Sequence, residues 1–350
     1  MNKWQDTLYP KARDGNGFRL LSMLLIFGLF LSCPKISRAE NESFPDTSNP
    51  SLANNTVIQY LRDGRYNEVV AQYDADSPTI LITFDTVLVG AYAFALNRVQ
   101  RETEAVELLV NVTAWDNQFS FDYLGIAQAH KFLGLFYLGH EVYSSGKTVS
   151  YSNAIHSFSR TVEADGSAEN CNLLALAYSS EARIKNSTEL MNRAVNYGAR
   201  ALSQDTANWV LYYNQGGYYE YLKDTEMAMQ NYSMAQAMGE AAYPVYYQIG
   251  ILQMKQGEYD NARVTFRTFI GLDINANITG TQMYGYLISK SYFKLAACYA
   301  IQCNTENTIA ILREAQTEGI IFPEPQLLND REFLPIATDQ TYLEFINNEY

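Results

Sequence analysis

The segment "YYQIGILQMKQGEYDNARVTFRTFIGLD", from Tyr246 to Asp273, predicts two short helices joined by a tight turn. Tyr246, Ile249 and Gly250 share one face of the first helix, because residues three and four apart lie together on a helix. Gly257 ends that helix, since glycine readily adopts the left-handed backbone that follows many helices. A helical hairpin of this size cannot bury its apolar face alone, so it predicts stacking on similar neighbours. The apolar stripe of the second helix is Ala262, Phe266 and Phe269.

The same small and aromatic residues recur along the chain at intervals of about 34 residues, as Gly216 lies 34 positions before Gly250. Small residues let two helices approach closely, and aromatic residues fill the space to the next hairpin. The chain is therefore predicted to be all-α and built from repeated hairpins. The matching positions elsewhere are Gly64, Tyr66, Val69 and Tyr73; Ala105 and Leu109; Ala154 and Phe158; Tyr219, Ala228, Tyr232 and Ala235; and Tyr292, Leu295, Ala296, Tyr299, Leu312 and Ala315.

This pattern resembles the tetratricopeptide repeat family, whose units carry an aromatic residue, Leu-Gly, Tyr, Ala, a second aromatic residue and Ala. The resemblance covers residues 52–316 and implies an α-solenoid that forms a right-handed superhelix. It is poorest over residues 166–205, where Gly198 stands at an aromatic position. The inserts "VYSSGKTVSYSN" and "INANITGTQMYG" predict longer loops or extended helices. Residues 317–350 are similar to the closing segment of such proteins and predict a cap with a final helix.

Residues 1–39 predict an export signal, followed by a linker at residues 40–51. Four basic residues precede the apolar run "LLSMLLIFGLFLSC", which is too short for a stable membrane span. Three outcomes stay open: lipidation at Cys33 in "FLSC", cleavage after Ala39 in "SRA", and an uncleaved anchor. The predicted location is the periplasm or the membrane-anchored cell envelope of a bacterium. Membrane contact is expected only through the signal or a lipid.

The composition and the motifs point away from nucleic acid and catalysis. A formal charge of −13 repels phosphate backbones and anionic lipid. The three histidines, His130, His140 and His156, lack the spacing of a metal site. No nucleophile elbow or phosphate loop occurs in the sequence. We therefore predict no catalytic residue, no metal, no cofactor and no enzymatic activity.

The cysteine count argues against a disulfide framework. Once the signal is removed, three cysteines remain, an odd number in an exported chain. They are predicted to be small buried residues. The three are Cys171, Cys298 and Cys303.

The resemblance implies that the first helix of each hairpin lines a concave binding groove. Lys290 and Lys294 stand where some family members hold the C-terminal carboxylate of a peptide. Tyr213, Gly217 and Gln248 replace other residues of that clamp, so carboxylate capture and two solvated lysines stay as alternatives. The predicted groove residues are Tyr213, Asn214, Gly217, Glu220, Tyr221, Tyr247, Gln248, Ile251, Lys255, Lys290, Phe293, Lys294 and Ala297.

The sequence thus predicts a non-enzymatic scaffold or adaptor of the cell envelope that binds a protein or an extended peptide in its concave groove. Two alternatives stay open. The many tyrosines allow a carbohydrate-binding envelope lipoprotein, because a tyrosine offers rigid area and a hydroxyl. The chain could also be a structural subunit of an outer-membrane assembly or transport complex.

Overall fold

A computed structural model describes residues 56–57, 59–61, 63–83, 86–114, 123–139, 149–239, 242–272 and 281–349. Over these ranges the chain forms helices and turns and contains no strand, so the all-α prediction is confirmed. The chain divides into two compact units, Met1–Thr206 and Ala207–Tyr350. The predicted export signal, the linker and Cys33 lie outside the described residues. Within the described ranges, every helix is too short or too polar to cross a bilayer.

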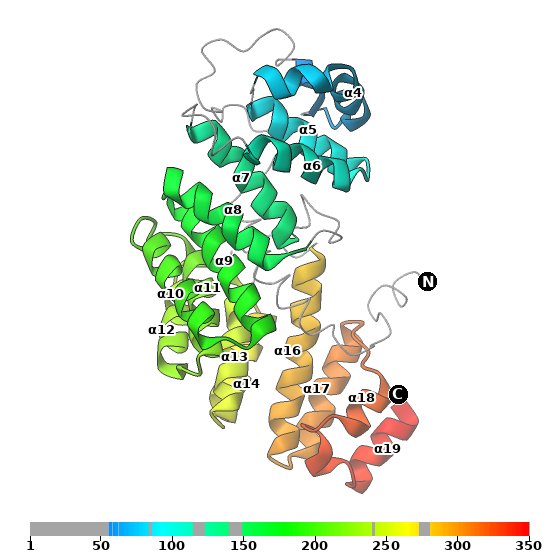
Figure 1. The fold of residues 1–350 in the computed structure, drawn as a ribbon. Coiled ribbons are helices and arrows are strands. Elements are labelled where there is room, and N and C mark those ends of the chain that lie inside the picture. The colour runs from blue at the N-terminus through cyan, green and yellow to red at the C-terminus, as the bar shows by residue number, and fades with distance from the viewer. Residues whose placement is uncertain are drawn as a thin grey trace. The chain divides into compact units, whose positions relative to one another are not determined.

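Unit 1 is a succession of helices in which each packs on its chain neighbour (Figure 1). Its N-terminal core contains Val69 of α4 and Ala105 and Leu109 of α6, all fully buried at positions that the repeat pattern assigned. The described helices of unit 1 are α4 (Tyr66–Thr83), α5 (Thr86–Arg98), α6 (Glu102–Thr113), α7 (Tyr123–Leu138), α8 (Tyr151–Ala164), α9 (Ala168–Lys185) and α10 (Thr188–Leu202).

The segment that matches the repeat pattern least, residues 166–205, still forms a helical hairpin from α9 and α10. Asn186 takes a left-handed backbone (φ 50°) and ends α9, and the Ser187 hydroxyl accepts a hydrogen bond from the first turn of α10. Gly198 is buried, and the neighbouring Tyr197 supplies an aromatic ring instead. Its ring stacks on Tyr178 of α9 with centroids 5.7 Å apart. The hairpin therefore keeps its aromatic contact, but the ring comes from the residue just before the position that the repeat pattern assigns.

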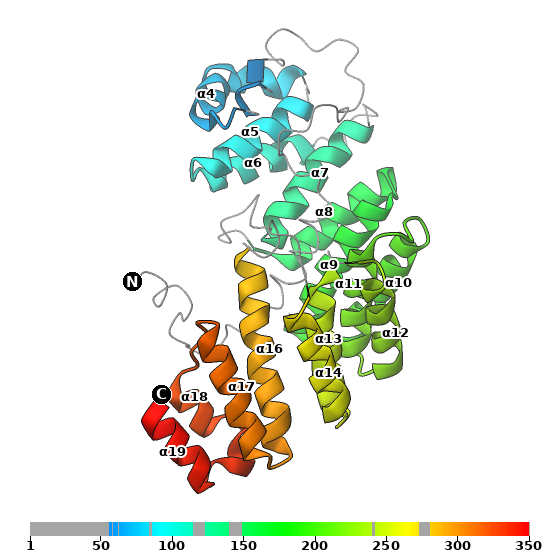
Figure 2. The same ribbon diagram turned by 180° about the vertical axis from the view of Figure 1, so that it is seen from behind.

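Unit 2 contains three successive hairpins and a C-terminal segment (Figure 2). Helices α16 and α17 lie side by side, and α14 packs on α16. Its helices are α11 (Trp209–Tyr221), α12 (Thr225–Gln236), α13 (Pro244–Lys255), α14 (Tyr259–Ile270), α16 (Gln282–Ile301), α17 (Thr305–Thr317), α18 (Glu324–Asn329), the 3-10 helix η3 (Leu334–Ile336) and α19 (Gln340–Glu349).

Small residues allow the two helices of each hairpin to approach. A Cβ atom at Gly250 of α13 would lie 2.5 Å from the ring of Phe266 on α14, far inside van der Waals contact. At Gly216 of α11 the corresponding distance to Tyr232 of α12 is 2.6 Å. This is the close approach that the repeat spacing predicts, and it sets the separation of the paired helices.

Each turn between the paired helices contains a residue with a left-handed backbone conformation. Only some of these residues are glycines. Gly257 (φ 78°) follows α13 as predicted. After α11 and α16 the same conformation is taken by Lys223 (φ 63°) and Cys303 (φ 56°), at a steric cost that glycine avoids. The turn geometry is therefore conserved between hairpins of this chain although its residue is not.

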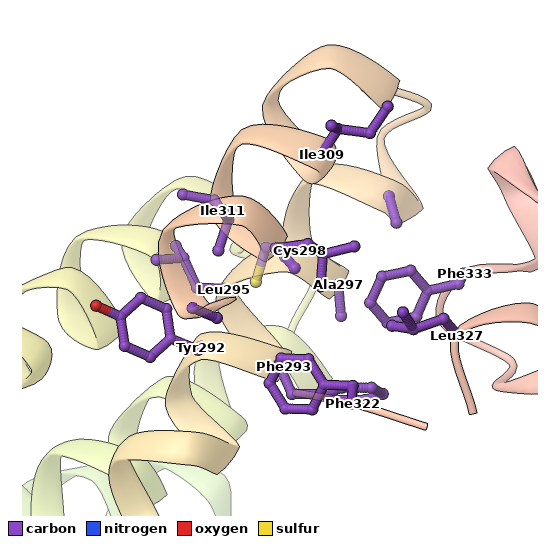
Figure 3. Close-up of a cluster of buried hydrophobic side chains, with 14 of the residues drawn as sticks. Tyr292, Phe293, Leu295, Ala297, Cys298, Ile309, Ile311, Phe322, Leu327 and Phe333 are labelled. Carbon is purple, nitrogen blue, oxygen red and sulfur yellow. The ribbon is translucent and has the colours of Figure 1, made fainter. Parts of the chain in front are cut away.

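The predicted cap, residues 317–350, packs on the last hairpin. In Figure 3, Phe322, Leu327 and Phe333 gather against Phe293 of α16. The ring centroid of Phe293 lies 5.4 Å from that of Phe322 and 5.1 Å from that of Phe333. The hydroxyl of Tyr342 in α19 donates a 3.0 Å hydrogen bond to the Leu327 carbonyl. The segment thus covers apolar surface that α16 and α17 would otherwise expose.

Candidate binding surface on the first helices of unit 2

Helices α11, α13 and α16 are the first helices of the three hairpins described in unit 2, and they carry all thirteen residues predicted above to line the groove. Four of these thirteen are buried and nine are at least partly exposed. One further residue of α16, Tyr286, is half-buried on the same face, one turn before Lys290. We give the name first-helix face to Tyr286 and six of the partly or fully exposed residues: Tyr221, Tyr247, Gln248, Lys255, Lys290 and Lys294.

Tyr213, Asn214 and Phe293 are only 4%, 1% and 3% exposed, and Ala297 is fully buried. The structure corrects the expectation that they line an open groove. The ring of Tyr213 packs against Tyr232 with centroids 5.9 Å apart, and Phe293 is enclosed by cap residues such as Phe333. All four residues therefore belong to the interior. A binding role for the other nine stays a prediction.

Polar contacts join α11 to α13 across the first-helix face. The Lys255 ammonium pairs with Glu220 at 2.5 Å, and the other oxygen of Glu220 accepts a 2.9 Å hydrogen bond from the Tyr232 hydroxyl. The Gln248 amide donates to the hydroxyl of Tyr213 at 3.3 Å. Both bridges link residues 35 positions apart, close to one repeat. The two first helices are thus tied together by side chains that sequence reasoning assigned to a ligand.

Lys294 is occupied by the cap. Its ammonium lies 2.7 Å from both carboxylate oxygens of Glu332, and the two side chains are only 21% and 24% exposed. The Asp330 carboxylate accepts a 2.9 Å hydrogen bond from the Glu332 backbone, which fixes the turn. Lys294 is therefore a mostly buried ion-pair partner of Glu332 and not a freely solvated lysine, and this pairing leaves Lys290 without a second free cation for a two-lysine clamp.

Lys290 has a different environment. Its ammonium lies 5.5 Å from the ring centroid of Tyr286. Burial, reinforced by the charge of Lys294, lowers the pKa of Lys290, and nearby Asp330 opposes that effect. Burial also raises the pKa of Tyr286 and of Tyr247, so both hydroxyls stay protonated at neutral pH. Within the described part of the chain, no hydrogen bond or ion pair reaches the ammonium of Lys290 or either hydroxyl.

Tyr286 was missed by sequence reasoning. The resemblance gave the register of α16 only from Lys290 onward, because "INANITGTQMYG" was treated as an insert. In the structure α16 begins at Gln282, so the insert contributes an extra helical turn to the same face. The four-residue spacing from Tyr286 to Lys290 is the signal that could have identified it.

Elsewhere in the described residues, few side chains that could bind a metal or take part in a reaction lie close together. No group of three or more His, Cys, Asp or Glu side chains in these ranges could hold a metal ion. His130 and His156 face each other edge to face, with ring centroids 6.3 Å apart, and His140 lies outside the described residues. Cys171 and Cys298 are buried thiols as predicted, whereas Cys303 is exposed.

An open depression of about 400 Å³ lies at the turns around α4 to α6 in unit 1. Its two arginines are already engaged with aromatic rings of the chain. Arg65 lies 4.3 Å from the ring centroid of Tyr60, and Arg98 lies 5.0 Å from that of Phe94. The depression is lined by residues 64–68 and 98–100, and the carboxylate among them, that of Glu68, is paired with Arg65 at 2.9 Å.

Comparisons with known proteins identify the fold. No family model and no curated protein matches the chain. The C-terminal part of a TPR repeat-containing protein from Cytophaga hutchinsonii is 12% identical, with a TM-score of 0.54, over 83% of this chain and 98% of that one. A monomeric mutant of IFIT1 with Gppp-AAAA is also 12% identical, with a TM-score of 0.54, over 95% of this chain and 68% of that one. At this level of identity the likeness concerns the fold alone.

Proposed function

From the premise that this chain is a tetratricopeptide repeat protein, we propose that it is a non-enzymatic scaffold that binds a protein or an extended peptide on the first-helix face of unit 2. The observation that carries the proposal is the first-helix face itself. Three neighbouring first helices present half-exposed tyrosines and polar side chains, while the apolar residues beneath them are fully buried. Tyrosine combines rigid contact area with a hydroxyl, and it is enriched at the centres of interfaces.

The side-chain contacts on the first-helix face support a binding role rather than a catalytic one. Its polar groups are mostly held by neighbouring helices, as in the contacts of Lys255 with Glu220 and Gln248 with Tyr213. Nucleophilic catalysis instead needs a nucleophile, a base and a third group that orients the base, all within reach of one another. The formal charge of −13 favours a protein partner over nucleic acid. The fold alone does not impose that choice, since the IFIT1 structure contains Gppp-AAAA.

Site-specific photocrosslinking tests this proposal. A photoreactive phenylalanine, p-benzoyl-phenylalanine, is placed at Tyr221 or at Tyr247 on the first-helix face. The control position is Val264 of α14, a second helix, whose side chain is 67% exposed. Crosslinking in the native cells should give the same discrete partner from both tyrosine positions and not from Val264. Equal crosslinking from all three positions would contradict the proposal.

We further propose that the chain is exported and acts in the bacterial cell envelope. The support is the arrangement of basic residues and an apolar run within residues 1–39. Intact-mass analysis of the purified protein distinguishes a lipidated N-terminus at Cys33 from a free one after Ala39. A cytoplasmic form that retains residues 1–32 would overturn this part of the proposal.

A further inference from the structure

We propose that three methionines on and directly after α12 form a site of reversible oxidation, and that their hairpin stays folded when they are oxidised. This inference goes beyond the proposed function, because α12 is a second helix, whereas the first-helix face lies on α11, α13 and α16. The reagent is a two-electron oxidant of the peroxide class, which converts methionine to its sulfoxide.

Methionine is concentrated in this part of the chain. The protein has nine methionines, and four of them lie within residues 227–238. Met227 and Met234 are seven positions apart, about two turns of α12, so they share one face of the helix. Met238 follows in the turn after α12, where Ala237 keeps a helical backbone and continues that face. We call Met227, Met234 and Met238 the methionine face.

The methionine face is accessible, whereas other methionines are enclosed. The side chain of Met234 is 46% exposed, and Met227 and Met238 are half-buried. Met191 of α10 is fully buried, and Met254 of α13 is only 9% exposed. An oxidant must reach the sulfur atom, so a buried methionine reacts only when its helix opens locally. The methionine face is therefore the part of these elements that an oxidant attacks first.

The reaction needs no catalytic group from the protein. The sulfur lone pair attacks one oxygen of hydrogen peroxide, an S–O bond forms and the O–O bond breaks. The departing hydroxide takes the proton from the oxygen that stays on sulfur and becomes water. Sulfur loses two electrons, which the peroxide gains. Methionine sulfoxide reductases reverse the change, with one enzyme for each epimer of the sulfoxide.

Oxidation of the methionine face changes the surface and spares the core. A sulfoxide oxygen on an exposed side chain remains hydrated, whereas a buried one would lose its hydrogen bonds to water. The contacts of α12 with the core come from Ala228, Tyr232 and Ala235, which are all buried. Met229 packs against this core, so a sulfoxide there should destabilise the hairpin.

Peroxide treatment of the full chain, followed by peptide mass spectrometry, tests the order of reaction. Accessible thiols are first blocked with iodoacetamide. Met234 should be oxidised about tenfold faster than Met191, which depends on local opening, and Met227 and Met238 should also precede Met191. The reductases should then remove the added oxygen. Equal rates at Met234 and Met191 in the folded protein would overturn the proposal, as would sulfoxides on the methionine face that the reductases cannot repair.

Urea unfolding tests whether the hairpin stays folded. The measurement uses Met229→Leu, so that the methionine in contact with the core cannot respond, and leucine conserves the side-chain volume. The urea midpoint of unit 2 should be the same before and after oxidation of the methionine face. A lower midpoint after oxidation would show that these residues support the core, which contradicts the proposal.

Hydrophobic-interaction chromatography tests the change of the surface. Oxidised wild-type protein should elute earlier than the untreated protein, because three apolar side chains become polar. The triple variant Met227→Leu, Met234→Leu and Met238→Leu should lose most of this shift. Met283→Leu is the matched control, because Met283 is also half-buried but lies on α16, and this variant should keep the shift. A shift of equal size in the triple variant would overturn the assignment to the methionine face.

Discussion

Replacing Gly250 with alanine is expected to destabilise unit 2 by about 2 kcal/mol. Helix propensity alone would favour the change by about 1 kcal/mol. The new methyl carbon, however, would lie 2.5 and 2.6 Å from two ring atoms of Phe266, whereas carbon atoms in contact lie about 3.5–4.0 Å apart. Phe266 is fully buried and can retreat only by displacing its neighbours. Overpacking costs about 1–3 kcal/mol, and a required shift of about 1 Å places this case near the upper value.

The assay is urea unfolding of the full chain followed by the fluorescence of Trp209, which lies in α11 of unit 2. Trp4 and Trp115 are replaced with phenylalanine in all variants, so that the signal reports on this unit. Gly285→Ala is the matched control, because its added Cβ would meet no atom within 4 Å. This variant should raise the free energy of unfolding of unit 2 by up to about 1 kcal/mol.

The reasoning is refuted if Gly250→Ala is as stable as Gly285→Ala. A double-mutant cycle adds a second check. Phe266→Leu should cost less in the Gly250→Ala background than in the wild type, because the smaller side chain relieves the clash.

Three further predictions concern the same unit. Lys223→Gly should stabilise it by about 0.5–1 kcal/mol in the urea assay, since a left-handed backbone strains a side-chain-bearing residue more than glycine loses in entropy; a loss of stability would contradict this account of the turn. Burial raises the pKa of the Cys298 thiol to about 12, so iodoacetamide at neutral pH should modify the exposed Cys303 and spare Cys298 until the chain unfolds, as peptide mass spectrometry can show. Burial and the nearby carboxylate of Glu314 raise the pKa of Tyr292 from 10.0 to about 12. Because the folded-state pKa lies above the unfolded one, the stabilising contribution of the neutral phenol is present below pH 10 and is lost as the pH rises toward 12. In the Tyr292→Phe variant the free energy of unfolding should fall less between pH 10 and pH 12. If its pH profile matches that of the wild type, the loss of stability comes from other groups.

Much of the fold could be predicted because its determinants are local. A glycine at one position and an aromatic ring 16 residues later specify a hairpin, as Gly250 with Phe266 and Gly216 with Tyr232 show. The α9–α10 hairpin was harder, because Tyr197 supplies its ring one position away from the pattern. Packing requires a ring in a given space rather than at a given sequence position, so a strict motif underestimates such a unit.

The candidate site was less predictable because burial and charge pairing are set by distant residues. The register placed Tyr213 and Phe293 on the correct helices, but rings from α12 and from the cap cover them. The partner of Lys294 is Glu332, 38 positions further along the chain. A turn of the cap brings that carboxylate to α16, and no spacing within a repeat encodes it. The local contribution of Tyr286 could have been found from helical periodicity alone.

The bridges between α11 and α13 have a consequence for binding affinity. Under the proposed function, Lys255 and Gln248 are already anchored to the neighbouring helix before a partner docks, so few side chains of this protein lose rotational freedom. The entropic cost of association then falls mainly on the flexible peptide. Stiffening that peptide in its bound shape would tighten the complex chiefly by this saving, with no new contact formed.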